Sequence, residues 1–234
     1  MSTIAERATK HVNLDFYRDP NLPEEVGGMA LEAPDSSQYV LRCPIRIPGS
    51  ILELPDELQW TADFVSKSYD YQQSVVGVDQ PYAYLTVRHG PVVSHTDDAL
   101  HVDGFSMKVP HIPEQNYIWA NRLPTEVLAF GIVLPDDFDP LRHNLQYFIQ
   151  DSIPPDCEVQ SLSEQTIYAM DPYIFHRRPI IAQSIARTFV RLSLTPIPID
   201  DVNNHINPAF GNICSDYDGV TEFRDTLKRY ALAQ

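Results

Sequence analysis

Proline limits the secondary structure that this chain can form. The 234 residues include 20 prolines, and these are distributed along the whole sequence. Proline fixes φ and has no backbone N–H, so it ends helices and interrupts central strands. The chain therefore favours short strands, turns and extended connections over long helices.

Between the prolines lie short runs with the composition of strands. They are separated by clusters of Pro, Asp, Asn and Gly, and they span residues 39–47, 81–89, 99–109, 116–122, 126–134, 157–162, 165–171 and 186–197. Many short strands with turn signals between them predict a β-sandwich or a barrel, and a double-sheet jelly roll is one such form. In the first run, alternation places Tyr39, Leu41, Cys43 and Ile45 on one face.

One segment has a clear helical pattern. Residues 54–73 carry an apolar stripe at helical spacing, formed by Leu58, Ala62, Val65 and Tyr69. The first 37 residues predict an irregular arm with one short helix, and residues 219–233 predict a closing helix. We expect a single domain over residues 1–234, with a core of roughly 38–197 to which the arm and the tail are added.

Charge and cysteine content narrow the class of protein. The formal net charge of −15 repels a phosphate backbone, which excludes nucleic acid as an expected partner. The cysteines, Cys43, Cys157 and Cys214, lie far apart and form neither a zinc spacing nor a redox spacing. No run of 18 apolar residues exists, so no membrane partner is expected either. These features predict a reduced, cytoplasmic protein.

Two His-x-Asp pairs stand close together, His95/Asp97 and His101/Asp103. On a strand, residues i and i+2 point to the same side, so such a pair offers one nitrogen and one oxygen donor to a single point. We favour His101/Asp103, because residues 99–109 continue with the alternation of a strand. His95 stands in a polar, turn-like segment, where it is either an exposed loop histidine or a substrate contact in a lid.

A second group of polar residues lies near the end of the expected core. His176 follows an apolar run, and Arg187 and Arg191 share one strand face with Phe189 and Ser193. Two arginines on one face of an otherwise apolar strand are costly to bury without an anion. This face therefore predicts a small dianionic ligand.

The run 81–89 offers a further polar face, made of Tyr82, Tyr84, Thr86 and Arg88. The pattern favours an ordinary polar sheet face, and the alternative is the wall of a cavity.

These features together resemble the Fe(II)/2-oxoglutarate-dependent oxygenases. The resemblance rests on His101-x-Asp103, on the distant His176, and on Arg187 eleven residues after that histidine, and it covers roughly residues 80–195. Two histidines and one carboxylate are the typical ligands of non-haem Fe(II) in oxygenases. The resemblance implies a mainly β fold, a double-stranded β-helix (jelly roll) with flanking helices.

The resemblance also implies cofactors and roles. His101, Asp103 and His176 would bind Fe(II), and Arg187 would pair with the far carboxylate of 2-oxoglutarate. Arg191 would contact the keto-acid carboxylate, and Thr125 would add a hydroxyl hydrogen bond.

The implied activity is oxidation of a small-molecule substrate by O2, chiefly hydroxylation, with release of succinate and CO2. The presence of Asp103 favours this over halogenation, because halogenases of the family carry a small residue there. Two other classes stay open. One is a metal-dependent cupin, an isomerase or dioxygenase that does not use 2-oxoglutarate and would not need Arg187. The other is a jelly-roll binding protein without a metal.

Overall fold

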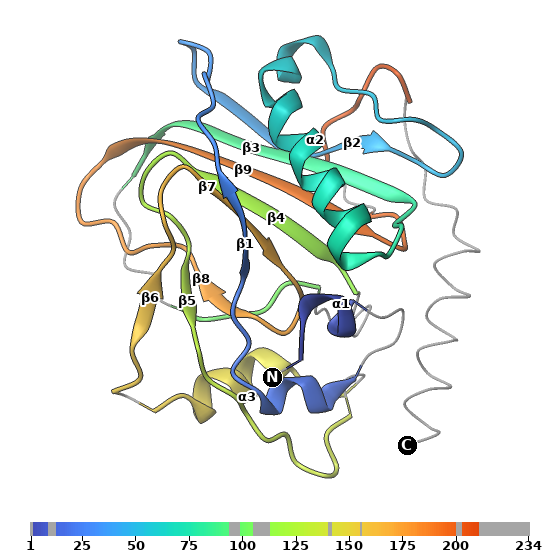
Figure 1. Cartoon of the computed structure of the whole chain (residues 1–234). Helices are drawn as coiled ribbons and strands as arrows, with labels where there is room; N and C mark the ends of the chain where they lie inside the picture. The colour runs from blue at the N-terminus through green and yellow to red at the C-terminus, as the bar shows by residue number, and fades with distance from the viewer. Residues whose placement is uncertain are drawn as a thin grey trace.

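Two antiparallel sheets form the framework of the chain (Figure 1). The computed structural model describes residues 2–8, 13–93, 99–104, 113–139, 142–154, 156–199 and 203–210. The six-stranded sheet has the order β1-β7-β4-β9-β3-β2, with bounds Glu24–Gly28, Thr166–Met170, Gln115–Ala120, Ile185–Thr195, Tyr82–Val92 and Gln38–Arg46. The three-stranded sheet has the order β6-β5-β8, with bounds Val159–Ser161, Glu126–Leu128 and Phe175–Arg177. The predicted mainly β, jelly-roll-like fold is confirmed.

The pairing of β3 with β9 sets the two faces of the large sheet. It runs without interruption from Tyr82↔Thr195 to Val92↔Ile185. Because side chains alternate along a strand, Val190 and Leu192 enter the main apolar core, whereas Arg187 and Arg191 line a pocket on the other face. The two-faced pattern predicted for this segment is confirmed.

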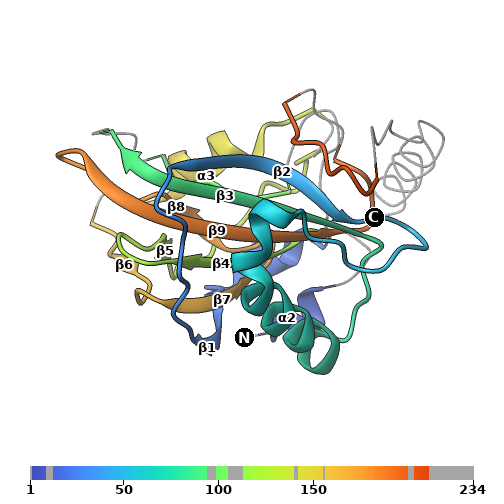
Figure 2. The ribbon, with the colours of Figure 1, turned by 90° about the horizontal axis from the view of Figure 1, so that it is seen from above.

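A helical segment with α2 at its centre packs on the apolar face of the large sheet. It consists of the 3₁₀ helix η2 (Asp56–Thr61), α2 (Ala62–Tyr71) and the π turn η3 (Gln72–Val76). Leu58, Phe64 and Val65 are buried in one core with residues of β2, β3, β4, β7 and β9. Figure 2 shows α2 lying across this sheet, on the side opposite α3 (Leu145–Ser152). The helix predicted over residues 54–73 is therefore confirmed, with irregular turns at both ends.

A bulge overturns the expected alternation in β2. The pairing of β2 with β3 shifts between Val40 and Cys43, and Arg42 has a φ of 46°. An extra residue in one strand reverses the faces that follow it. Tyr39 is therefore 61% exposed, while Val40 and Cys43 are buried. The prediction that Tyr39 and Cys43 share a face is wrong.

The N-terminal arm is more ordered than its composition predicts. It forms α1 (Ile4–Arg7), the 3₁₀ helix η1 (Leu14–Arg18) and β1, which pairs with β7 at the sheet edge. The sheet thus begins at Glu24, ahead of the expected core boundary at residue 38. The short helix expected in the arm is α1, which begins with a capping box between Thr3 and Glu6. The pairing of β1 with β7 has no such local signal, because it joins residues far apart in the chain.

Other boundaries also differ from expectation. The strands expected over 126–134 and 157–162 shorten to β5 and β6, and the sequence did not predict α3. The helix predicted over 219–233 lies outside the described residues. Within the part of the chain that the structure describes, no helix has the length and apolar character to cross a membrane.

The arm is fastened to the turn that precedes β8 by a buried ion pair. Arg7 Nε lies 2.6 Å from Asp171 Oδ2, and their side chains are 3% and 0% exposed. Asp171 Oδ1 also accepts a hydrogen bond from the backbone N–H of Tyr173, and Tyr17 Oη donates to the carbonyl of Pro172. The residues that lead to His176 are thereby held by the N-terminal arm.

We predict that Arg7→Ala lowers the free energy of unfolding by about 3–5 kcal/mol, because it leaves the buried Asp171 carboxylate without its partner. Urea unfolding followed by circular dichroism measures this loss. Arg18→Ala is the matched control: its pair with Asp15 is exposed, and its loss should cost less than about 1 kcal/mol. Equal effects of the two substitutions would contradict the structural role of the buried pair.

Candidate active site

A reciprocal pair of backbone hydrogen bonds brings two distant histidines side by side. The N–H of His101 donates to the carbonyl of His176, and the N–H of His176 donates to the carbonyl of His101, both at 2.9 Å. His176 also pairs with Val127 of β5 on its other side. The small sheet is thus extended by one residue, and that residue is His101.

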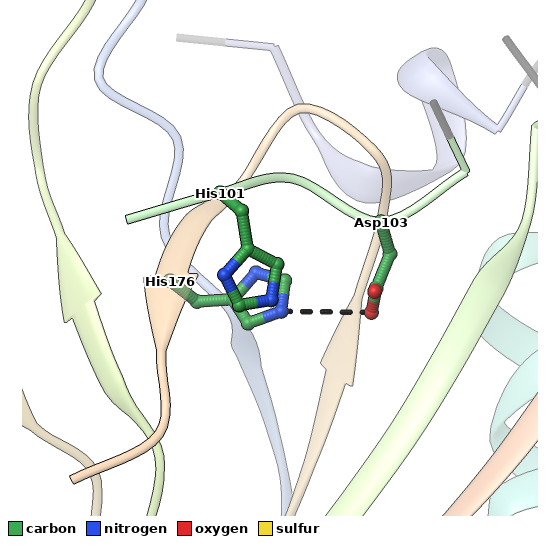
Figure 3. A group of neighbouring side chains, drawn as sticks. All are labelled: His101, Asp103 and His176. Carbon is green, nitrogen blue, oxygen red and sulfur yellow. Dashed lines mark ion pairs between the residues drawn. The ribbon is translucent and has the colours of Figure 1, made fainter. Parts of the chain in front are cut away.

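The three sequence-predicted ligand residues form one cluster (Figure 3). Each of His101, Asp103 and His176 offers a donor atom, and these atoms all lie within 4.8 Å of one another. His176 Nε2 is 3.5 Å from Asp103 Oδ2, and the two imidazole rings have centroids 4.5 Å apart. Two imidazole nitrogens and one carboxylate oxygen converging in this way can hold a divalent transition-metal ion.

Hydrogen bonds to backbone carbonyls fix which nitrogen of each histidine is available. His101 Nδ1 lies 3.3 Å from the carbonyl oxygen of Ala99, and His176 Nδ1 lies 3.0 Å from that of Ile174. A carbonyl oxygen only accepts, so each neutral imidazole carries its proton on Nδ1. The Nε2 lone pairs remain for a metal, an arrangement in which the outer contacts orient the ligands.

The His101–Asp103 segment does not form the strand that its alternation predicted. Within residues 99–104, only His101 makes a β-bridge. The chain bends at Asp103 and Gly104, and Gly104 has a φ of 74°. The rest of the expected strand, from residue 105 on, lies outside the described residues. His101 and Asp103 therefore converge through a bend rather than through strand pleating.

Gln146 of α3 takes the place of a strand partner for this segment. Its Oε1 accepts from the N–H of Val102 at 3.4 Å, and its Nε2 donates to the carbonyl of Val102 at 3.1 Å. One carboxamide thus satisfies both backbone groups of the residue between the two ligands. Sequence reasoning missed Gln146 because α3 itself was not recognised.

Asp103 is oriented by polar side chains from the large sheet. Asn116 Nδ2 donates to Asp103 Oδ2 at 3.0 Å, and Ser193 Oγ donates to Asn116 Oδ1 at 2.5 Å. Arg191 Nη1 lies 3.4 Å from the same carboxylate oxygen. Asn116 carried no signal in the sequence, since it stands between Gln115 and a short apolar run and finds Asp103 only through the fold.

Electrostatics favour the metal-binding protonation states of the cluster. Burial alone would raise the pKa of Asp103, but Arg191, His176 and His101 outweigh it, and this pKa lies below its ordinary value. Burial lowers the pKa of His176, although Asp103 opposes this shift. An ionised Asp103 and a neutral His176 are the forms that bind a metal.

The cluster opens on a pocket of about 380 Å³ whose lining includes Arg187, Arg191 and Thr125. Arg187 is only 8% exposed, its Nε donates to the carbonyl of Arg122 at 3.3 Å, and its guanidinium stacks 4.9 Å from the ring centroid of Phe189. Among the described residues Arg187 has no carboxylate partner. Burial, aided by the nearby Arg88, lowers its pKa to about 10.

Arg191 and Thr125 complete the set of predicted site residues on this pocket. Besides its contact with Asp103, Arg191 has a buried Nε that finds no acceptor within the described part of the chain. Thr125 is 7% exposed and lies on the connection between β4 and β5. A buried donor without an acceptor is costly, so the Arg191 Nε is suited to a bound carboxylate.

The polar face of β3 divides into two parts. Thr86 and Arg88 line the pocket, whereas Tyr84 is buried and its hydroxyl accepts from the N–H of Ile199. The prediction of a cavity wall therefore applies to Thr86 and Arg88. His95 and Asp97, the alternative ligand pair, lie outside the described residues.

No protein-family model matches this sequence, and no curated protein matches it either. Several solved structures align with the chain. AviO1 from Streptomyces viridochromogenes aligns with a TM-score of 0.42 and 11% identity, over 86% of this chain and 99% of that one. ThoJ, a non-heme monooxygenase in its apo form, has a TM-score of 0.39 and 9% identity, over 99% of both chains. A 2OG-Fe(II) oxygenase family protein from Burkholderia pseudomallei has a TM-score of 0.35 and 11% identity, over 82% and 91%. At these values the function has to be argued from the site itself.

We predict that Gln146→Ala weakens binding of a divalent probe ion such as Zn²⁺ by about 10- to 100-fold, because the ligand-bearing backbone loses its support. Isothermal titration calorimetry measures the affinity. Gln150→Ala is the matched control: Gln150 lies one turn along α3 and lines the same pocket, but no hydrogen bond ties it to residues 99–104 in the described structure. Unchanged Zn²⁺ affinity in Gln146→Ala would show that the carboxamide is dispensable.

Proposed function

We propose that this chain is an Fe(II)/2-oxoglutarate-dependent oxygenase that hydroxylates a small molecule. The observation that carries the proposal is the joint presence, on one pocket, of a His–Asp–His cluster and a buried arginine without a carboxylate partner among the described residues. Either feature alone is compatible with several functions, since metal clusters serve many chemistries and arginines often lie in polar networks. Together they match a metal ion and an organic dianion bound side by side.

The donor set fits iron. His101 Nε2, His176 Nε2 and one Asp103 oxygen would hold Fe(II) and leave its other positions open for ligands. When bound, the ion supplies the site at which O2 is reduced by electrons from the keto acid and the substrate. The charge of Asp103 partly offsets that of Fe(II), while Asn116 and Arg191 keep the carboxylate in one orientation.

The arginines fit 2-oxoglutarate. Arg187 would form a charge-assisted bidentate pair with its far carboxylate, and the hydroxyl of Thr125 would donate a further hydrogen bond. Arg191 lies four residues further along β9, so its Cα is about 13 Å from that of Arg187 by strand rise. Its Nε, which has no acceptor among the described residues, would donate a hydrogen bond to the keto-acid carboxylate. Phe189 stacks on Arg187 and limits the positions of its guanidinium.

The overall reaction balances without a further reductant. One oxygen atom of O2 enters succinate as 2-oxoglutarate loses CO2, and the other enters a C–H bond of the substrate to give an alcohol. A metal-dependent cupin that does not use 2-oxoglutarate would have no use for a buried, acid-free Arg187. This residue is therefore the point at which the two functions differ.

Formation of succinate tests the proposal directly. We expect the protein to convert 2-oxoglutarate into succinate in air with added Fe(II), slowly even without substrate, and to form none under nitrogen or without iron. Mass spectrometry of succinate gives the readout. His101→Ala, Asp103→Ala and His176→Ala should each abolish it and also abolish Zn²⁺ binding in calorimetry. Bound metal without succinate under any condition would instead favour the cupin.

For Arg187→Lys, we predict a 10- to 100-fold loss of 2-oxoglutarate affinity, or about 1.4–2.8 kcal/mol, because lysine keeps the charge but lacks the planar fork. Calorimetric titration of the Zn²⁺-loaded protein with 2-oxoglutarate under nitrogen measures it. Arg142→Lys, whose side chain is 82% exposed, serves as the control. If Arg187→Lys binds 2-oxoglutarate as the parent does, the carboxylate is held elsewhere, with Arg191 the next residue to test.

A further inference from the structure

Arg88 of β3 lies beside Arg187 of β9 on the face of the large sheet that lines the pocket. In the pairing of these strands, Arg88 is directly opposite Phe189, and Arg187 is opposite Gly90. Opposite residues of an antiparallel pair share a face, and diagonal neighbours are about 7–8 Å apart, within reach of long side chains. Arg88 and Arg187 are diagonal neighbours of this kind, and both line the pocket.

Aromatic rings restrict the position of both guanidinium groups. The guanidinium carbon of Arg187 lies 4.9 Å from the ring centroid of Phe189, so the Arg187 side chain leans toward the residue that is opposite Arg88. The guanidinium carbon of Arg88 lies 5.9 Å from the ring centroid of Tyr39, its partner on β2. Arg187 is buried and Arg88 is exposed. The two cations therefore occupy the inner and the outer part of one side of the pocket.

No acidic side chain among the described residues neutralises these two arginines. Neither has a carboxylate partner there, and the lining of the pocket includes no aspartate or glutamate from the same part of the chain. Burial is the main cause of the low pKa of Arg187, and the charge of Arg88 adds to it. Two adjacent cations repel each other, whereas an anion bound beside them is attracted to both.

The hydrogen-bonding capacity of a carboxylate leaves room for a second arginine. An ionised carboxylate has about four lone-pair sites. In the proposed function, Arg187 fills two of them and Thr125 fills a third. The Nε of Arg187 already donates to the carbonyl of Arg122, so its terminal nitrogens are the donors left for a ligand. One site on the carboxylate remains for a further donor, and Arg88 stands beside Arg187.

We propose that Arg88 and Arg187 together bind one carboxylate group, which in the proposed function is the far carboxylate of 2-oxoglutarate. The inference rests on that function for the identity of the ligand. Arg187 supplies the buried contact, and Arg88 supplies the contact nearer to solvent. Arg88 is then a specificity-determining residue, because it favours keto acids with a second carboxylate over keto acids that end in an apolar group.

Calorimetry on the Zn²⁺-loaded protein under nitrogen tests this role with two keto acids. One is 2-oxoglutarate, and the other is 2-oxopentanoate, which has the same carbon chain but a methyl group in place of the far carboxylate. We expect Arg88→Gln to weaken 2-oxoglutarate binding by about tenfold, because a charge-assisted hydrogen bond is lost. Its affinities for 2-oxopentanoate and for Zn²⁺ should equal those of the parent. Arg142→Gln is the control, since that side chain is 82% exposed and lies outside the lining.

Combining Arg88→Gln with Arg187→Lys tests whether both arginines act on the same group. Contacts to one carboxylate are coupled, so the loss of 2-oxoglutarate affinity in the double variant should differ by about threefold or more from the product of the single losses. The inference is overturned if Arg88→Gln binds 2-oxoglutarate as the parent does, if it weakens both keto acids by the same factor, or if the single losses simply multiply.

Failure of the proposed function gives a different result. If the Zn²⁺-loaded parent binds no 2-oxoglutarate, the oxygenase proposal fails. Glutarate, which has two carboxylates and no keto group, is then titrated into the same proteins. Weaker glutarate binding in both Arg88→Gln and Arg187→Lys supports a shared carboxylate site. Unchanged binding in either variant, or no binding by the parent, overturns it.

Discussion

The site depends on the backbone pairing of His101 with His176. These reciprocal hydrogen bonds join the bend that contains His101 to the middle of the three-residue strand β8. They fix the position of one imidazole relative to the other. The bridge is a single residue long, so it needs support on both sides. Val127 of β5 pairs with His176 on one side, and the Gln146 carboxamide holds the residue after His101 on the other.

A second layer of support comes from the start of the chain. Arg7 and Tyr17 bind Asp171 and Pro172, in the turn that connects β7 to β8. A buried ion pair is a costly way to gain stability, because both charges lose their hydration, but removal of one partner is strongly destabilising because the other charge is left buried. The N-terminal arm is thus part of the structure that positions His176, although it contributes no residue to the His–Asp–His cluster.

The charge distribution matches a pocket for small anions. A net charge of −15 disfavours large polyanions, whereas the arginines on the pocket create a local field of opposite sign. Burial is what makes this field selective: Arg187 has lost most of its hydration, so a carboxylate that reaches it restores interactions that water no longer supplies. The same residue on an exposed face would carry little information about a ligand.

The sequence by itself determined the features that repeat along the chain or lie a fixed number of residues apart. Alternation predicted the two faces of β9, helical spacing predicted α2, and the separations of His101, Asp103, His176 and Arg187 indicated one candidate site. Tertiary structure decided the rest. The β2 bulge at Arg42 reversed a predicted face, the His101–Asp103 segment became a bend, and Asn116, Gln146 and Arg7 acquired their partners. The physical reason is that these contacts join residues far apart in the chain, and such contacts leave no periodicity in the sequence around either partner.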